Sequence, residues 1–389
     1  MAQGGPKHRA LLVLLDGCRP DALLAADAPN LKKLAFDNGA FSFHVNCGGV
    51  PLSAPCWTTI LTGVRQEDHH VTTNDLDALS LDAQGHVIVT PVPECVCAPA
   101  RGPLCAIFRR GKSQRPAAPL PATIFEKLAQ ESCSSALFTV GSWEGIGRLA
   151  GAPPRTLECR VDHASLSIRY FEASLEQELQ ATKEAITEAI RLVEDGDDGP
   201  ELVAVYLHFI DGNGHEHGFG YDVPEYRAAI TAIDSEVGRL IDSAGVRAAA
   251  GREDWLVVVT TDHGGTSQRR MPPEMRRNFA SCGCVQKGIS QVSLRGVHGL
   301  RELTQHTQTF QILGLSKAVQ SGEMLPQPAP EDVVPTLLQH IVGGRSDSAS
   351  WPGAGSKARG LLPRIPPIPT AVEEPPPGEP ASKSRRVEA

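Results

Sequence analysis

Three apolar runs of the chain each end in an aspartate that is closely followed by glycine or histidine. The runs and their endings are 10–15 with Asp16-Gly17, 202–210 with Asp211-Gly-Asn-Gly-His215, and 255–261 with Asp262-His263-Gly264. A turn or a helix cap explains one such aspartate. Three of them, two with a histidine one or four residues further on, indicate a cluster of metal ligands instead.

The chemistry that this cluster predicts is hydrolysis at a pair of metal ions. Carboxylate oxygen and imidazole nitrogen both bind Zn²⁺, and three aspartates with several histidines can supply two adjacent ions. Two ions about 4 Å apart clamp a phosphoryl group and stabilise its entering and leaving oxygens. Glycines beside the ligands permit sharp turns and leave room for an anion.

Ser53, in the run VPLSAPCWTTILTGV, is the candidate nucleophile. A serine just ahead of an apolar helical run is commonly only an N-cap, and no Gly-x-Ser-x-Gly elbow surrounds this one. A serine alcohol is a poor nucleophile at neutral pH until a base or a metal activates it. We therefore expect Ser53 to stand at a helix start and to direct its hydroxyl at a metal.

The elements that must position these side chains alternate along the chain. The three apolar runs are typical of strands that are covered on both faces, and helices are expected over 174–193 and 224–250. This alternation predicts an α/β fold with a mostly parallel central sheet sandwiched by helices. Functional residues of such folds lie past the carboxyl ends of strands, which is where the three aspartates stand.

Taken in order, the motifs resemble those of the alkaline phosphatase superfamily, and most closely its type I phosphodiesterase/nucleotide pyrophosphatase family. The motifs are Asp16-Gly17, Ser53-Ala54-Pro55 with Thr62-Gly63, Asp211-x-x-Gly-His215-x-x-Gly218, and Asp262-His263-Gly264. The resemblance spans roughly residues 8–342. It implies an alkaline phosphatase-like fold with loop insertions near the site.

The resemblance also implies a role for each motif residue. One zinc would be held by Asp16, Asp262 and His263 and would coordinate the alcohol of Ser53. The second would be held by Asp211, His215 and a late histidine that precedes a glycine and an apolar strand. His298 fits that description best, and His306 is the alternative. Manganese at one or both positions stays open as the alternative to zinc.

Substrate contacts are expected near the nucleophile. Cys56 lies three residues after Ser53 and offers no amide donor, so support for a phosphoryl oxygen would come from backbone N–H groups or from a side chain such as Asn74. Cys56, Trp57 and Asn74 are the candidate substrate-binding residues. Three further histidines are expected on the surface or behind the ligands: His69, His70 and His217.

Composition sets the remaining expectations. A net charge of -8 in 389 residues argues against nucleic acid as the main partner. The apolar run after Lys7-His8-Arg9 is too short for a signal sequence, and no stretch reaches the roughly 20 apolar residues of a membrane span. A cytoplasmic protein is therefore expected, with its ten cysteines reduced.

The predicted domain organisation is one catalytic domain and a tail. The domain covers residues 1–342, with insertions at about 91–121 and 266–297, and a Pro-rich, disordered tail covers 343–389. The second insertion is basic and is expected either to be a solvated loop or to attract a phosphorylated substrate. The tail could dock a reader of Pro-rich segments, and Cys-x-Cys pairs in both insertions leave a further structural metal open.

The function expected from these residues is a two-zinc phosphodiesterase or nucleotide pyrophosphatase that forms a phosphoserine intermediate at Ser53. Its substrate would be a phosphorylated small molecule, with a nucleotide as one option. Two alternatives keep the scaffold and change the ester, namely a phosphomonoesterase and a sulfatase. Trp57 stands where a sulfatase would carry an arginine. A catalytically silent binding protein is the alternative outside the enzymes.

Overall fold

The computed structural model of this chain describes most of the predicted catalytic domain and a few residues of the predicted tail. The residues described are 6–72, 74, 120–141, 145–150, 158–161, 164–170, 174–270, 273, 295–299, 301, 303–343 and 360–362. Several sequence predictions lie outside them, namely most of both insertions with their Cys-x-Cys pairs and most of the Pro-rich tail. The four cysteines whose side chains are described, Cys18, Cys47, Cys56 and Cys133, form no disulfide.

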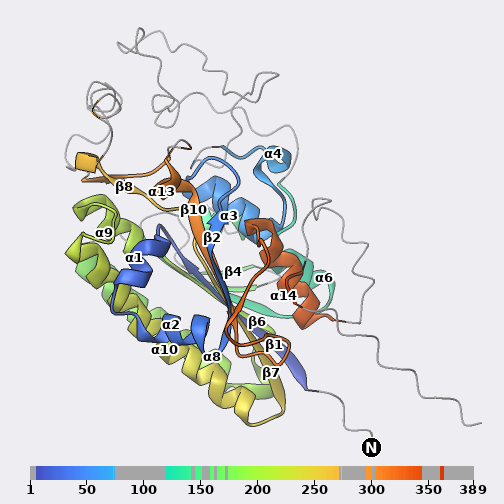
Figure 1. Ribbon diagram of the computed structural model, residues 1–389. Coiled ribbons are helices and arrows are strands. Elements are labelled where there is room, and N and C mark those ends of the chain that lie inside the picture. Colours follow the sequence, from blue (N-terminus) through green and yellow to red (C-terminus); the bar gives the residue numbers. More distant parts are fainter. Residues whose placement is uncertain are drawn as a thin grey trace, which may run out of the picture.

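Strands and helices alternate along the chain (Figure 1). The strands are β1 (Lys7–Leu15), β2 (Gly39–Asn46), β3 (Ser135–Gly141), β4 (Glu158–Val161), β5 (Ala164–Tyr170), β6 (Leu202–Leu207), β7 (Glu253–Thr260), β8 (Thr266–Ser267), β9 (Gly296–Val297), β10 (Gln308–Gly314) and β11 (Glu323–Met324). The helices are α1 (Pro20–Ala25), α2 (Pro29–Phe36), α3 (Ser53–Thr62), α4 (Gln66–His69), α6 (Ile124–Gln130), α7 (Gly145–Leu149), α8 (Leu175–Glu194), α9 (Phe209–His217), α10 (Pro224–Ala249), α13 (Thr304–Thr307) and α14 (Val333–Ile341). The described residues also form short 3₁₀ turns, η1 (Gly196–Asp198), η2 (Gln268–Arg270) and η3 (Pro330–Asp332).

Nine of the described strands form one central sheet in the order β11-β2-β10-β7-β1-β6-β3-β5-β4. The five strands from β7 to β5 run parallel. β10 is antiparallel to both of its neighbours, β7 and β2, and β4 closes the other edge antiparallel to β5. The predicted mostly parallel sheet is confirmed.

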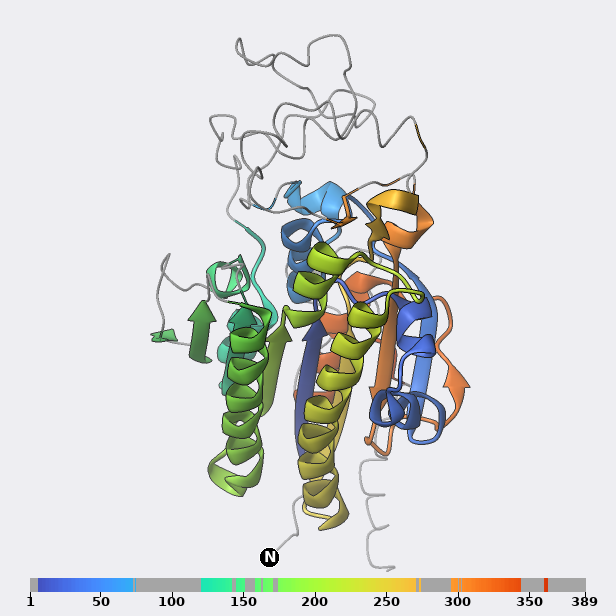
Figure 2. The same ribbon diagram turned by 90° about the vertical axis from the view of Figure 1, so that its left-hand side faces the viewer.

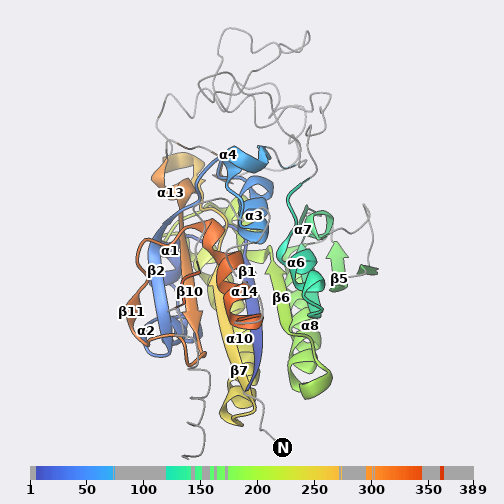
Figure 3. The same cartoon turned by 90° about the vertical axis from the view of Figure 1, so that its right-hand side faces the viewer.

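Helices cover both faces of the sheet, as the sequence predicted. In β1, Leu11, Val13 and Leu15 join one buried cluster, while Ala10 and Leu12 alternate into the other. The first cluster packs under α1, α2, α8, α9 and α10, of which α8 and α10 stand in front of the sheet in Figure 2. The second packs under α3, α6, α7 and α14, which Figure 3 shows from the opposite side. Burial on both faces explains why β1, β6 and β7 are apolar throughout.

Local signals account for the helix starts. Ser174 caps α8 and forms a capping box with Gln177, and Thr123 does the same with Glu126 at α6. Proline occupies the first turn of α10, where a backbone N–H would have no acceptor within the helix, so the N–H that proline lacks costs nothing. The two long helices therefore begin within a residue of where the sequence predicted them.

One predicted strand is shorter than expected. The run 202–210 was interpreted as a single strand, but β6 ends at Leu207 and α9 begins at Phe209. Phe209 and Ile210 are buried in the turn of a helix, and a buried helix and a buried strand are equally apolar. Asp211 and His215 consequently lie on one helix face, four residues apart, and not on a loop.

Two further contacts lie at the limits of the predicted domain. The ends of the second insertion pair as a small ribbon, because β8 is antiparallel to β9. Residues 360–362 of the predicted disordered tail pack on α14, where Leu362 is buried and its carbonyl accepts a hydrogen bond from Gln339. A buried leucine gives this short stretch a reason to dock, which the composition of the tail conceals.

Candidate functional site

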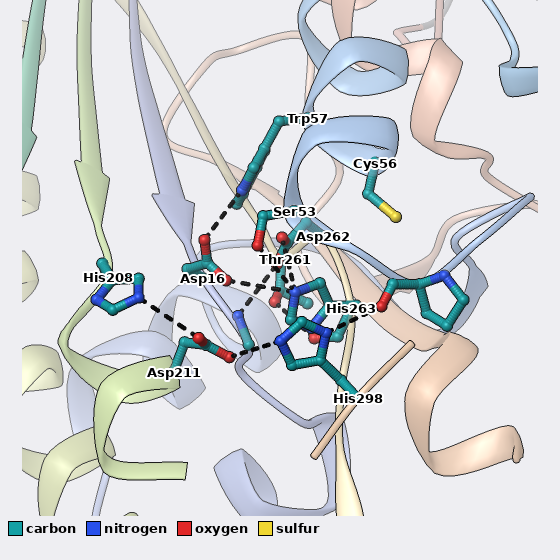
Figure 4. A network of polar contacts seen from close by, with 12 residues as sticks. Asp16, Ser53, Cys56, Trp57, His208, Asp211, Thr261, Asp262, His263 and His298 are labelled. Carbon is teal, nitrogen blue, oxygen red and sulfur yellow. Dashed lines mark hydrogen bonds and ion pairs between the residues drawn. The ribbon is translucent and has the colours of Figure 1, made fainter. Parts of the chain in front are cut away.

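The three aspartates of the sequence motifs meet at the carboxyl edge of the parallel strands (Figure 4). Asp16 directly follows β1, Asp262 lies two residues after β7, and Asp211 is in the first turn of α9, just beyond β6. All three are at most 2% exposed. Because β6, β1 and β7 are adjacent in the sheet, residues far apart in the sequence are brought together at one edge.

Two aromatic side chains hold Asp16 in place from behind. The indole Nε1 of Trp57 donates to Asp16 Oδ2 at 3.2 Å, and the hydroxyl of Tyr206 donates to the same oxygen. The two rings meet edge to face with their centroids 5.7 Å apart. Asp16 Oδ1 is left without a hydrogen bond in the described part of the chain and lies 3.5 Å from His263 Nε2.

Three histidines present the same ring nitrogen to the centre of the site. His215, His263 and His298 each place Nδ1 3.0–3.1 Å from a backbone carbonyl, of Gly296, Gly264 and Pro51 respectively. A carbonyl only accepts, so Nδ1 carries the hydrogen and Nε2 carries a lone pair in each neutral ring. This second hydrogen bond is the usual support of a metal-binding histidine.

Groups rich in lone pairs converge where the Nε2 atoms meet. Ser53 Oγ lies 3.2 Å from His263 Nε2, and Asp262 Oδ2 lies 3.3 Å from it. On the neighbouring side, His298 Nε2 is 3.1 Å from His215 Nε2, which is itself 3.1 Å from Asp211 Oδ2. Acceptors at these distances repel one another unless a proton or a cation lies between them.

The residues fit a pair of divalent cations. One oxygen of each aspartate, Asp16 Oδ1, Asp211 Oδ1 and Asp262 Oδ2, is buried and forms no hydrogen bond within the described residues. Asp16, Asp262 and His263 offer ligand atoms that all lie within 4.8 Å of one another, and so do Asp211, His263 and His298. The second group differs from the predicted one, which has His215 in place of His263. The short distances from His215 to Asp211 and His298 favour the predicted set.

The electrostatics show how strongly the carboxylates influence one another. Burial, followed by repulsion from Asp211, raises the pKa of Asp16. Burial, followed by repulsion from Asp16, raises the pKa of Asp262 well above its usual range. Burial also acts to raise the pKa of Asp211, but His215 and His208 outweigh it and hold that pKa well below its usual range. Metal ions would stabilise all three carboxylates in the ionised form.

Gly17 makes the close approach of the strand ends possible. Its φ of +63° lies in the left-handed region, and a Cβ on it would stand 2.4 Å from Asp211 Oδ1. Its N–H donates to Asp262 Oδ1 at 3.0 Å, and its carbonyl accepts a hydrogen bond from the Tyr226 hydroxyl. The Asp-Gly pair after β1 is therefore required by the geometry of the site as well as by the turn.

Ser53 does not cap its helix. It is the first residue of α3, Leu52 is the N-cap residue, and no side chain of the N-cap accepts a hydrogen bond there. Asn74 takes over part of this role, because its Oδ1 accepts from the N–H of Ala54 at 3.1 Å. The common N-cap role is therefore not seen at Ser53, and its hydroxyl faces His263.

The three predicted substrate contacts lie in different surroundings. Asn74 is exposed and stands at the start of α3, beside Ser53. Trp57 is fully buried behind Asp16, an arrangement that favours a positioning role. Cys56 is 2% exposed, and its thiol donates to the carbonyl of Val50 at 3.3 Å, away from the aspartates in Figure 4.

Sequence reasoning missed a carboxylate–imidazole pair behind Asp211. His208 places Nε2 3.5 Å from Asp211 Oδ2 and Nδ1 3.1 Å from Glu178 Oε1. Both His208 and Glu178 are buried, and Glu178 comes from α8, 30 residues earlier in the chain. The one sequence signal was a histidine inside an otherwise apolar run.

The remaining histidines of the prediction are placed as follows. His69 is buried, with Nε2 3.0 Å from Thr59 Oγ1, and His70 is exposed. His217 lies 3.9 Å from Glu216. His306, the alternative ligand, is fully buried, and its carbonyl accepts a hydrogen bond from Gly264. His298 is the late histidine that contacts His215.

The basic insertion is described only at its ends. Arg270 is paired with Asp222 at 2.5 Å, and its guanidinium lies over the ring of Tyr221. Arg295 is exposed and follows the undescribed part. The pairing of Arg270 reduces the positive charge that this segment can offer to a substrate.

Comparison with solved structures supports the fold. Mouse ectonucleotide pyrophosphatase/phosphodiesterase 5, in an inactive form with AMP, superposes with a TM-score of 0.54 at 16% identity, over 86% of this chain and 95% of that chain. The human protein gives 0.51 at 15% identity with the same coverage. A phosphonate monoester hydrolase from Agrobacterium radiobacter gives 0.52 at 13% identity, over 86% of this chain and 74% of that chain. No curated protein sequence matches.

The fold and the site define a hydrolase of the alkaline phosphatase superfamily. The family model for type I phosphodiesterase / nucleotide pyrophosphatase matches residues 10–272, and the chain belongs to that family. It is accordingly a hydrolase that acts on phosphoester bonds, as the sequence predicted. Within the described part of the chain, no helix is both long and apolar enough to cross a membrane.

Proposed function

We propose that the chain cleaves phosphodiester or pyrophosphate bonds with Ser53 as a covalent nucleophile. The observation that carries this proposal is the position of Ser53 Oγ, 3.2 Å from His263 Nε2 at the start of a buried helix. Among the described residues, His263 is the side chain that forms a hydrogen bond with this hydroxyl. The alcohol is therefore directed at the cluster of aspartates and histidines.

Two divalent ions, zinc by preference, fit the ligand sets of the sequence prediction. Asp16, Asp262 and His263 would hold one ion, next to Ser53, and the other would be held by Asp211, His215 and His298. When bound, such ions lower the pKa of an alcohol or water and neutralise charge on phosphoryl oxygens. Imidazole and carboxylate ligands also suit manganese.

The chain's own groups prepare the covalent step. Ser53 Oγ would lose its proton to solvent and form the bond to phosphorus while the bond from phosphorus to the leaving oxygen breaks. Water later hydrolyses the phosphate ester on the serine and returns a proton to Oγ. In the first turn of α3, Pro55 has no N–H, and the N–H groups of Ala54 and Cys56 donate to Asn74 and Leu52. The N–H of Ser53 is therefore the backbone donor of this turn that we propose for a negatively charged phosphoryl group. Asn74, which contacts the N–H of Ala54, is the side chain best placed to add a hydrogen bond there.

The substrate class that we propose is a phosphorylated small molecule, with nucleotides as the first group to test. Mouse ectonucleotide pyrophosphatase/phosphodiesterase 5 was solved with AMP, and the family is named for nucleotide pyrophosphatases. A diester substrate leaves one phosphoryl oxygen esterified, which lowers the negative charge that the site must balance. Asn74, which is exposed and lies beside Ser53, is a described group able to meet such a substrate.

A serine replacement tests the nucleophile. We expect the Ser53→Ala variant to hydrolyse phosphodiesters roughly 10³-fold more slowly or worse, because it lacks the covalent nucleophile. Its metal content should stay unchanged. Turnover is measured with bis-p-nitrophenyl phosphate, and p-nitrophenyl phosphate and p-nitrophenyl sulfate are run beside it. Ser243→Ala, in the far half of α10, is the matched control.

The same assays separate the alternatives. Faster hydrolysis of the phosphomonoester than of the diester would indicate a phosphomonoesterase, and faster hydrolysis of the sulfate ester would indicate a sulfatase. Metal binding without turnover on any ester would indicate a silent binding protein. Full diester turnover by Ser53→Ala would end the covalent mechanism.

A further inference from the structure

A second cluster of metal-binding side chains lies at the opposite end of β1 and β7. His8 and Asp254 are register partners on these adjacent parallel strands, so their side chains stand side by side on one face of the sheet. His340 reaches the same face from α14. One ligand atom from each of the three lies within 4.8 Å of the others. Asp16 follows His8 by eight residues, about 26 Å along a strand, so this cluster is separate from the candidate active site.

The hydrogen bonds of His340 leave one ring nitrogen available as a ligand. Its Nε2 lies 3.0 Å from the carbonyls of Arg9 and of Asp254. Because both partners are acceptors, Nε2 carries the hydrogen and Nδ1 carries the lone pair. His340 is buried, with 4% of its surface exposed. Donation of the second N–H to a backbone carbonyl is the arrangement that metal-binding histidines use.

Asp254 is fixed in place by the turn after β10. Its Oδ1 accepts from the N–H of Lys317 at 3.2 Å, and its Oδ2 accepts from the hydroxyl of Ser316 at 3.3 Å. Asp254 is 7% exposed, and no lysine or arginine of the described residues forms an ion pair with it. A buried carboxylate without a nearby cation is costly, and an ion bound by this cluster would supply that charge.

His8 completes the cluster from the solvent side. Its Nδ1 is buried and forms no hydrogen bond within the described residues, although it lies 3.7 Å from Asp254 Oδ2. The ring meets that of His340 edge to face, with the centroids 5.0 Å apart. In a tetrahedral zinc site with bonds of 2.0–2.1 Å, neighbouring ligand atoms lie about 3.4 Å apart. The separation of His8 Nδ1 from Asp254 Oδ2 is close to that value.

We propose that His8, Asp254 and His340 bind one divalent transition-metal ion, with zinc as the first candidate. Two imidazoles and one carboxylate suit zinc and leave a fourth position for water. The ion would join the start of β1, the start of β7 and α14. Its place at the opposite end of β1 from Asp16 makes it a structural ion that stabilises the core and takes no part in the hydrolysis.

Zinc stoichiometry of the full chain tests this site. Protein without a histidine tag is stripped with chelator, equilibrated with zinc, dialysed and assayed by plasma mass spectrometry. We expect the His8→Gln variant to hold one zinc fewer than the wild type, with unchanged phosphodiester hydrolysis. The side chain of His8 is 39% exposed, so its replacement leaves the core intact. His44→Gln, an exposed histidine on β2, is the control and should bind the full complement.

Asp254→Asn provides the second measurement. It keeps the hydrogen bonds with Ser316 and Lys317 but weakens the ligand set, so zinc should be lost by one equivalent here as well. Zinc should also raise the thermal midpoint of the wild type more than that of either variant. Equal zinc content and equal midpoint shifts in wild type and both variants would overturn the proposal. A matching loss of zinc in His44→Gln would overturn it too, since it would reveal loose surface binding.

Discussion

Trp57 shows how a single buried side chain can control the candidate metal site. Its indole N–H is one of the two donors to Asp16 Oδ2, and it is directed there by the packing of the ring against Tyr206. The other oxygen of Asp16 then faces His263. Supporting hydrogen bonds set the orientation of a metal-binding side chain. Trp57 therefore acts through Asp16 and not through the substrate.

We predict that Trp57→Phe lowers phosphodiester hydrolysis and zinc affinity by about 10–100-fold, the usual effect of losing a supporting hydrogen bond at a metal site. The ring is retained, so most of the packing survives. Zinc affinity and kcat/KM are measured for the purified variant. Trp255→Phe is the matched control, because this fully buried indole donates to Glu253 at the other end of β7. Equal losses in the two variants would assign the effect to packing alone.

The candidate ligands could be predicted from sequence, whereas their supports could not. Asp and His beside glycines at strand ends carry a strong local signal, and the structure brings Asp211, His215 and His298 together. Tyr206, by contrast, is 190 residues away from Asp16 and looks like one more apolar strand residue. Glu178 resembles any acidic residue in the first turn of a helix. Their roles depend on contacts that form only in the tertiary structure, and a short sequence motif does not predict such contacts.

At the scale of elements, the site is made by strand ends that are tied to one another. The N–H of Gly17 donates to Asp262, and the N–H of Cys18 donates to Thr261 Oγ1 at 3.0 Å. These bonds join the turn after β1 to the turn after β7. The sheet therefore fixes the spacing of the aspartates before any ligand binds, which is the preorganisation that catalysis needs.

Gly17→Ala tests this tie. Its φ of +63° would cost an alanine roughly 1–2 kcal/mol, and the added Cβ would stand 2.4 Å from Asp211 Oδ1. We expect a matching loss of stability in urea and a larger loss of diester hydrolysis. Gly251→Ala is the control, since φ there is +77° and nothing lies within 4 Å of the added Cβ. Its stability should fall by a similar amount with no change in activity. Retained activity in Gly17→Ala would show that the turn tolerates displacement of Asp211.

The same scale shows where sequence periodicity reaches its limit. The apolar runs 10–15 and 255–261 predicted the ends of β1 and β7 to within three residues, because a strand that is buried on both faces appears as a continuous apolar run. The run at β6 continued through Phe209 and Ile210, which are buried in α9. Hydrophobicity reports burial and does not distinguish a helix from a strand over two residues.

At the scale of the whole molecule, the carboxyl edge of the sheet concentrates buried negative charge. Three aspartates, none more than 2% exposed, lie together in a chain whose net charge is already -8. Burial and mutual repulsion raise the pKa values of Asp16 and Asp262. This arrangement costs folding free energy at neutral pH, and cations bound at the edge would offset it.

Metal removal is therefore expected to destabilise the entire fold. Zinc at 100 times its Kd adds about 2.7 kcal/mol per site to the free energy of unfolding, and a chelator should remove that gain. Urea unfolding with zinc and with chelator measures the difference. Asp211→Asn should reduce the gain, while Asp222→Asn, which lies outside the cluster and pairs with Arg270, should not. Identical unfolding curves with zinc and with chelator would contradict a metal centre.

Acid stability depends on histidines that are buried in the neutral form. His69 is 5% exposed, its Nδ1 accepts from the N–H of Val71 at 3.0 Å, and its Nε2 faces Thr59 Oγ1. Protonation of Nδ1 would destroy the first bond. Burial, with a smaller contribution from His70, lowers the pKa of His69 to about 4 from the ordinary 6.5. The unfolded chain thus binds this proton first, so the contribution is intact above pH 6.5 and is lost as the pH falls towards 4.

We expect the His69 contribution to reach roughly 2 kcal/mol of lost stability at pH 5, since 1.5 pH units correspond to about 2 kcal/mol. Urea unfolding at pH 7 and pH 5, in chelator so that metal release does not enter, measures it. His69→Gln keeps polar groups for Thr59 and Val71 and should show a pH dependence smaller by that amount. His44→Gln, at an exposed position of β2, should behave like the wild type. If His69→Gln retains the full acid sensitivity, the loss must come from other buried groups, of which His306, with its pKa lowered by burial to about 3, is the next to replace.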